Sequence, residues 1–129
     1  EIGSGLVGSE MCIRDRFTVI LHNCGNTGHC TPAMLATGAQ GYHFGNKADM
    51  LAALRECPSD VWVMGNLDPV GVFRMLTPEE VFAQTEELLS RTGGYANFIV
   101  STGCDTPSEV PFDNIQAFYL AVEKYNKGR

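Results

Sequence analysis

Residues 41–65, GYHFGNKADMLAALRECPSDVWVMG, decide the fold. Two short apolar runs, 41–45 and 61–65, enclose a segment whose apolar residues recur at helical spacing, which predicts a strand, a helix and a second strand. Asn46 is the expected N-cap of the helix, and Pro58 ends it because proline cannot continue an α-helix. The connections are short, so we expect the two strands to be parallel neighbours.

The same alternation extends in both directions along the chain. The other predicted strands are FTVIL (17–21) and FIVST (98–102), and the other predicted helices are 32–37, 78–92 and 111–127, with loops at 66–69 and 103–109. Because the strands are almost continuously apolar, we expect a parallel α/β sheet with both faces covered. Such units form either a small open sheet or half of a (β/α)8 barrel, and both place their chemistry at the carboxyl ends of the strands.

Composition and charge restrict the function. The chain has 129 residues and a formal net charge of -6, and it contains no cluster of Lys and Arg, which argues against a nucleic-acid or anionic-membrane surface. It has no apolar run long enough for a transmembrane helix. The acidic charge makes a small-molecule partner the expected one. The cysteine count of 5 is odd and no secretory signal is recognisable, so we expect a cytoplasmic protein with reduced thiols.

The first 16 residues, EIGSGLVGSEMCIRDR, are set apart from the rest. They show neither helical nor strand periodicity, and GLVGSEMCIRDR resembles a translated sequencing-adapter tail. We therefore predict that 1–16 is a non-native tail and that 17–129 is the domain; the alternative is a short, frayed native terminus. Both interpretations leave Cys12 without a role.

The residues that follow the predicted strands are rich in metal-binding side chains. His22 and Cys24 are two apart at the end of an extended segment, so their side chains can share a face, and Cys104 follows the fourth strand. One His and two Cys form a known zinc ligand set whose fourth position is open to water or substrate. A thiol bound there would lose its proton and become a nucleophile. The spacing alone leaves ordinary core cysteines as the alternative.

The other histidines and cysteines of this part of the chain also need an interpretation. Cys30 is an alternative third ligand that is more simply placed at a helix start, and His29 is interpreted as a polar loop residue. Cys57, at the end of a helix, is interpreted as structural. His43 is either a buried histidine bonded to a carbonyl or a residue lining the barrel mouth.

Two aspartates also have two alternative interpretations each. Asp68 is either a substrate-binding carboxylate or a cap for the helix that follows, and Asp105 either orients the zinc ligands or caps a turn. His43 and Asp68 are thus weak candidates for cofactor binding, and no residue is assigned to catalysis.

An ordered set of motifs runs through residues 17–127: HNCGN, YHFGNKADM, VMGNLDP, TPEEV and STGCDTP, followed by FDNIQAF. This set resembles the C-terminal half of the uroporphyrinogen decarboxylase superfamily, and within it the corrinoid-dependent methyltransferase branch. The resemblance implies a (β/α)8 TIM barrel of which this chain supplies the last four units. It also implies zinc held by His22, Cys24 and Cys104, and methyl transfer between a corrinoid and a thiol, with a corrinoid protein as a possible partner.

The resemblance leaves two alternative functions besides methyl transfer. True uroporphyrinogen decarboxylases, enzymes of porphyrin metabolism, use no metal and usually carry Gly-His-Gly where this chain has Gly-Cys-Asp at 103–105. A non-catalytic zinc- or corrinoid-binding module is the other alternative. We expect the full-length parent to be an enzyme and this fragment alone to be inactive, because a half-barrel lacks half of the mouth.

Overall fold

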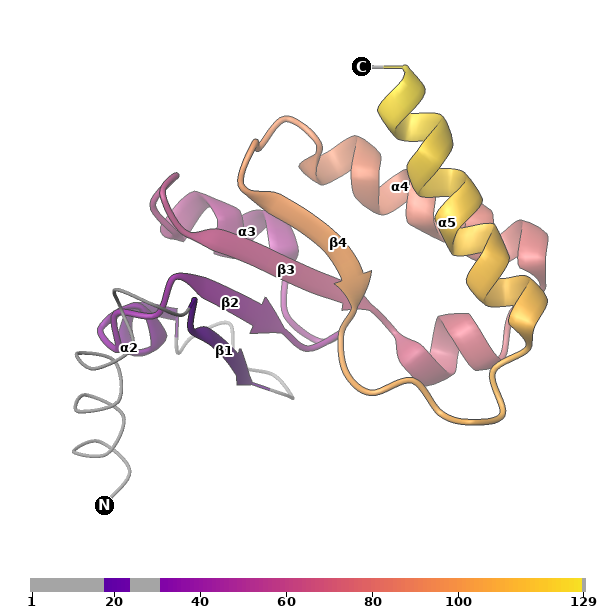
Figure 1. Cartoon of the computed structure of the whole chain (residues 1–129), viewed down its shortest axis with the longest axis horizontal. Coiled ribbons are helices and arrows are strands. Elements are labelled where there is room, and N and C mark those ends of the chain that lie inside the picture. The colour runs from indigo at the N-terminus through magenta and orange to yellow at the C-terminus, as the bar shows by residue number, and fades with distance from the viewer. Residues whose placement is uncertain (1–17, 24–30, 129) are drawn as a thin grey trace.

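The computed structural model describes residues 18–23 and 31–128, in which strands and helices alternate (Figure 1). The elements, in chain order, are β1 (Ile20–Asn23), α2 (Thr31–Leu35), β2 (Gly41–Phe44), α3 (Met50–Glu56), β3 (Trp62–Leu67), the π-helix η2 (Pro69–Arg74), α4 (Pro78–Thr92), β4 (Phe98–Thr102) and α5 (Phe112–Lys127). Among these residues, no helix is long and apolar enough to cross a membrane.

The strands form one parallel sheet, as the sequence predicted, and their order in it is β1-β2-β3-β4. His22 pairs with His43, which pairs with Met64, and Met64 pairs with Ile99. Paired residues of parallel strands point to the same face of the sheet, so these four side chains form one row across it. The register therefore brings the ends of all four strands to one edge.

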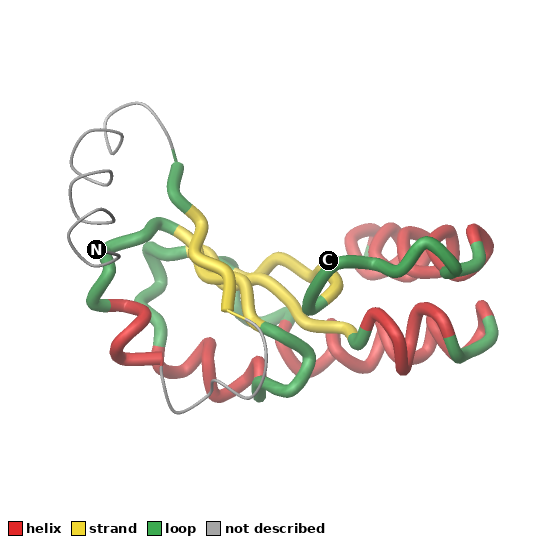
Figure 2. The backbone as a smooth tube through the Cα atoms, turned by 90° about the horizontal axis from the view of Figure 1, so that it is seen from below, coloured by secondary structure: helices red, strands yellow, loops and turns green. Residues whose placement is uncertain are grey.

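Among residues 18–23 and 31–128, helices cover one face of this sheet, so the expectation that both faces are covered is not met by the part of the chain that the structure describes. Figures 1 and 2 together place α2 and α3 on one side of the strands. Tyr42, Phe44 and Val63 point to that side and are almost fully buried. On the other face Trp62 and Ile99 are 45% and 43% exposed. In a closed barrel this second face is the packed interior, and covering it requires further strands.

The structure differs from the prediction in the segments that follow β2 and β3. The N-cap of α3 is Asp49, not Asn46: its carboxylate accepts hydrogen bonds from the backbone N–H groups of Leu51 and Ala52. β3 continues to Leu67, beyond the predicted end at 65, because Asn66 and Leu67 keep pairing with β4. The predicted loop at 66–69 is thus reduced to Asp68, because Pro69 already begins η2, a helix that the sequence pattern did not predict.

The last two helices pack against each other beside β4 (Figure 1). α4 begins with the predicted cap: the Thr77 hydroxyl accepts from the Glu80 N–H, and the Glu80 carboxylate accepts from the Thr77 N–H. Lys124 of α5 forms an ion pair with Glu86 at 2.9 Å and lies over the Phe82 ring. The contacts of Lys124 thus join α5 to α4.

Candidate functional site at the strand ends

His22, the first predicted zinc ligand, lies near the end of β1 on the open face of the sheet. Its Nδ1 is 3.2 Å from the main-chain oxygen of His43. A carbonyl oxygen can only accept, so Nδ1 carries the hydrogen and Nε2 carries the lone pair. Metal-binding histidines show this pattern, since a carbonyl or carboxylate usually holds the other ring nitrogen. The contact therefore fits a zinc ligand that binds through Nε2.

His43 lies next to His22 and connects it to β4. The two rings have centroids 4.6 Å apart and are tilted by 32°. His43 Nε2 is 2.7 Å from the main-chain oxygen of Thr102 and 3.1 Å from Ser101 Oγ. His43 is thus bonded to a carbonyl, as one interpretation expected, but it is half-buried rather than buried; its place at a barrel mouth stays a prediction.

Two further contacts join the loops that follow the strands. The Asn66 amide donates to the main-chain oxygens of Gly45 and Ala48, at 2.9 and 2.6 Å. A Cβ on Gly103 would lie 2.5 Å from the backbone nitrogen of Asn46, so only glycine permits this approach. The end of β3 and the start of the segment after β4 are therefore both held against the loop that follows β2, just before Cys104.

Cys104 is half-buried and follows the end of β4. Cys24 lies outside the described residues, as do Cys12, His29 and Cys30. Within residues 18–23 and 31–128 no three His, Cys, Asp or Glu side chains form a metal-binding cluster. The three-ligand site thus stays a prediction, in which the described residues supply His22 and Cys104.

Asp68 has the capping role that the sequence analysis gave as one alternative. Its Oδ1 accepts from the backbone N–H groups of Val70 and Gly71, at 3.0 and 2.9 Å, and so begins η2. A carboxylate at a helix N-terminus also interacts favourably with the helix dipole. The structure thus shows a local structural function for Asp68, and a role in substrate binding stays a prediction.

Cys57 is buried at the end of α3, where its backbone N–H donates to the Ala53 oxygen. Burial, together with the smaller effect of the neighbouring Glu56 carboxylate, raises the pKa of its thiol from 9.0 to about 11. A thiol of this kind stays protonated at neutral pH and is a poor metal ligand and nucleophile. This environment agrees with the structural interpretation.

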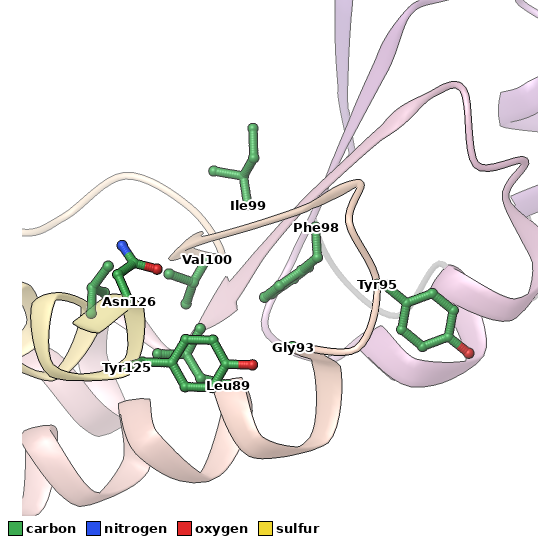
Figure 3. A pocket seen from close by; sticks show the side chains of 9 residues that line it. Leu89, Gly93, Tyr95, Phe98, Ile99, Val100, Tyr125 and Asn126 are labelled. Atoms are coloured by element: carbon green, nitrogen blue, oxygen red, sulfur yellow. The ribbon is translucent and has the colours of Figure 1, made fainter. Parts of the chain in front are cut away.

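Two cavities border β4, one at each end. A cavity of about 340 Å³ lies beside the carboxyl end, lined by Thr102, Thr106, Phe73 and Phe118. The other, of about 230 Å³, lies between α4, β4 and α5 near the amino end of β4. Figure 3 shows Phe98 and Val100 facing Leu89 and Tyr125 there, with Ile99 on the opposite side of the strand. Only the first cavity lies at the edge where parallel sheets carry their chemistry.

Comparison with known proteins establishes the family. The family model described as uroporphyrinogen decarboxylase (URO-D) matches residues 9–125. The chain belongs to the uroporphyrinogen decarboxylase family. The match begins inside the stretch 1–16, and the origin of that stretch stays a prediction.

Curated relatives of this URO-D family chain are methyltransferases. It is 31% identical over 106 residues to methylcobamide:CoM methyltransferase MtbA of Methanosarcina mazei and 30% identical to MtbA of Methanosarcina acetivorans, with 82% of this chain and 30% of each relative covered. A methylated-thiol–coenzyme M methyltransferase of Methanosarcina mazei is 25% identical over 105 residues, or 81% of this chain and 27% of the relative. The chain thus spans less than a third of the length of these relatives.

A solved structure confirms the fold. A methyltransferase from Methanosarcina mazei superposes with a TM-score of 0.81 at 18% identity, covering 96% of this chain and 35% of that protein. The parallel sheet and its helices are thus four β/α units of the (β/α)8 barrel class.

Ser101, Thr102 and Asn66 contribute to the strand ends although the sequence analysis did not select them. Ser101 and Thr102 lay inside a predicted strand, and Asn66 lay in a predicted loop, so periodicity gave no sign of their polar contacts. The useful signal was their position, since each stands within three residues of a predicted strand end.

Proposed function

We propose that the full-length protein transfers a methyl group between a corrinoid and a thiol, with zinc bound by His22, Cys24 and Cys104. Three things support this: the methylcobamide:CoM methyltransferases among its relatives, the His-x-Cys and Gly-Cys-Asp motifs, and the His22 hydrogen bond. The single observation that supports the metal assignment is the 3.2 Å contact between His22 Nδ1 and the His43 oxygen, because a main-chain carbonyl that holds one ring nitrogen is typical of metal-binding histidines.

The chemistry of the donor set fits this reaction. Two thiolates and one neutral imidazole balance the charge of a zinc ion, and bound zinc would supply a deprotonated, nucleophilic thiol at neutral pH. His22 is held on the open face, where an incoming thiol has access to it, and Cys104 follows a strand end fixed by neighbouring loops.

The test is metal analysis of the full-length protein. We expect about one zinc per chain and a change in zinc coordination when a small thiol such as 2-mercaptoethanesulfonate is added, detected by X-ray absorption. A protein with all three ligands intact that holds no stoichiometric zinc would contradict the proposal and favour a metal-independent decarboxylase. Tightly held zinc that no thiol reaches would favour a non-catalytic binding module.

The choice between Cys24 and Cys30 needs its own comparison, since both lie in the ten-residue stretch LHNCGNTGHC at 21–30. We expect Cys24→Ser to lose zinc and Cys30→Ser to retain it, because Cys24 is spaced to share a face with His22. The reverse result would identify Cys30 as the ligand.

A further inference from the structure

We propose that His43 is a positioning residue that sets the distance between the two zinc-ligand segments, His22 on β1 and Cys104 after β4. This inference rests on the proposed zinc site and assigns His43 no contact with substrate. Its basis is that one side chain touches both segments although they belong to the two outer strands of the described sheet.

The first step is the contact with His22. The His43 main-chain oxygen fixes the proton of His22 on Nδ1, and the His43 ring packs against the His22 ring at a centroid distance of 4.6 Å. The hydrogen bond sets the tautomer, while the ring contact restricts rotation of the imidazole. The plane in which His22 Nε2 presents its lone pair is therefore restricted by the His43 side chain.

The second step is the contact with β4, which His43 reaches across β3. Because the Thr102 oxygen can only accept, His43 Nε2 carries the hydrogen and donates it over 2.7 Å. Ser101 Oγ lies 3.1 Å from the same nitrogen and donates to the same Thr102 oxygen at 3.0 Å. The imidazole is thus oriented by two groups located two and three residues before Cys104.

The segment between Thr102 and Cys104 cannot shift independently of the neighbouring strand β3 and the loop after β2. The Gly103 N–H donates to the Leu67 oxygen at 2.8 Å, and its α-carbon has no room for a side chain against Asn46. A displacement of the Thr102 carbonyl therefore moves the start of the Cys104 loop. His43 holds that carbonyl at a fixed distance from the His22 ring.

His43 is not itself placed as a zinc ligand by this geometry. Its Nε2 carries the hydrogen and is held by Thr102, so a metal could not take that nitrogen without breaking the bond. Groups that orient metal ligands in this way typically change metal affinity by about 10- to 100-fold when they are replaced.

The experiment compares His43→Leu, His43→Gln, Ser101→Ala and Ser90→Ala in the full-length protein. Leucine removes the ring and the donor, glutamine keeps an N–H donor, and alanine at 101 removes one of the two groups that orient the imidazole. Ser90→Ala is the matched control, because the Ser90 hydroxyl bonds to its own helix away from the site. Zinc affinity and the absorption spectrum of the cobalt(II)-substituted protein are measured, together with the thermal midpoint.

We expect H43L to bind zinc at least about tenfold more weakly and to shift the cobalt ligand-field bands. H43Q should recover most of the affinity, S101A should shift the bands in the same direction by less, and S90A should match wild type. If the wild type holds zinc and neither H43L nor S101A changes affinity or spectrum, the inference is overturned while the proposed function stands. If the wild type holds no zinc, the proposed function fails and the inference fails with it. Should H43L not fold, S101A alone decides by the same spectral criterion.

Discussion

His22 donates its Nδ1 hydrogen to the main-chain oxygen of His43, and the two imidazole rings lie 4.6 Å apart on the open face of the sheet. The register makes this pairing necessary, since the two residues are partners in the β1–β2 ladder. Each ring has one nitrogen held by a main-chain carbonyl, so the backbone sets both tautomers. In the proposed zinc site, His22 would therefore have its ring oriented before the metal binds.

Cys104 and Cys57 form a matched pair for testing the zinc site. In the full-length protein we expect Cys104→Ser to lower the zinc content to a small fraction of wild type, because a serine hydroxyl is not a thiolate ligand. Cys57→Ser should retain the wild-type zinc content, since Cys57 is buried behind α3 with a protonated thiol. Zinc is measured by atomic emission after dialysis against a weak chelator. Equal zinc in both variants would exclude Cys104 as a ligand.

The buried thiol of Cys57 also predicts a pH effect on stability. The folded thiol keeps its proton up to about pH 11, whereas the unfolded thiol releases it near pH 9.0. Between these values the unfolded state binds fewer protons, so the free energy of unfolding falls as the pH rises, by at most about 3 kcal/mol. Urea unfolding at pH 8 to 11 measures this effect.

The control for this measurement is Cys57→Ala, which has no group that titrates at this position. Its stability should fall less steeply above pH 9.0 than that of the wild type, although alanine lowers stability at every pH by leaving a small cavity. Parallel curves for the two proteins would show that Cys57 does not contribute to the alkaline loss.

Replacing Asn114, which is not part of the proposed zinc site, should greatly lower the free energy of unfolding. It is 1% exposed, and its amide donates to the main-chain oxygens of Phe73 and Leu76, at 2.6 and 2.8 Å. Asn114→Ala would remove the donor from the buried Phe73 carbonyl and the half-buried Leu76 carbonyl, which we expect to cost about 1–3 kcal/mol. Asn126→Ala, at an exposed position on the same helix, should change stability by less than about 0.5 kcal/mol. Chemical unfolding of both full-length variants measures the difference, and equal stabilities would contradict the role of Asn114.

The order of strands and helices could be predicted because periodicity and caps are local properties. Thr77 and Glu80 form the expected capping box, and the strand register places His22 on the open face. The contact of His43 with Thr102 could not be predicted, since it joins residues 59 apart and depends on how β2 and β4 approach each other across β3. The helix η2 was missed because a π-helix has no distinctive sequence period.

The exposed sheet face predicts how this chain behaves by itself. Ile20, Trp62 and Ile99 are 51%, 45% and 43% exposed on one face, and β1 and β4 are the edges of the described sheet. Apolar surface and unpaired strand edges of this kind favour association between chains. We therefore expect residues 17–129, expressed alone, to self-associate or fold poorly.

Sedimentation velocity and thermal unfolding measure this behaviour, and a pair of double variants locates its cause. Trp62→Glu with Ile99→Glu should reduce the association, because charges on the open face repel a second copy. Tyr119→Glu with Leu120→Glu changes two side chains of α5 that are also exposed, at 65% and 51%, but lie away from the open face. This second double variant should associate like the wild-type segment. A monodisperse monomer with a cooperative melt, obtained without any substitution, would show that four β/α units of this barrel suffice for a stable fold and that the open face needs no partner.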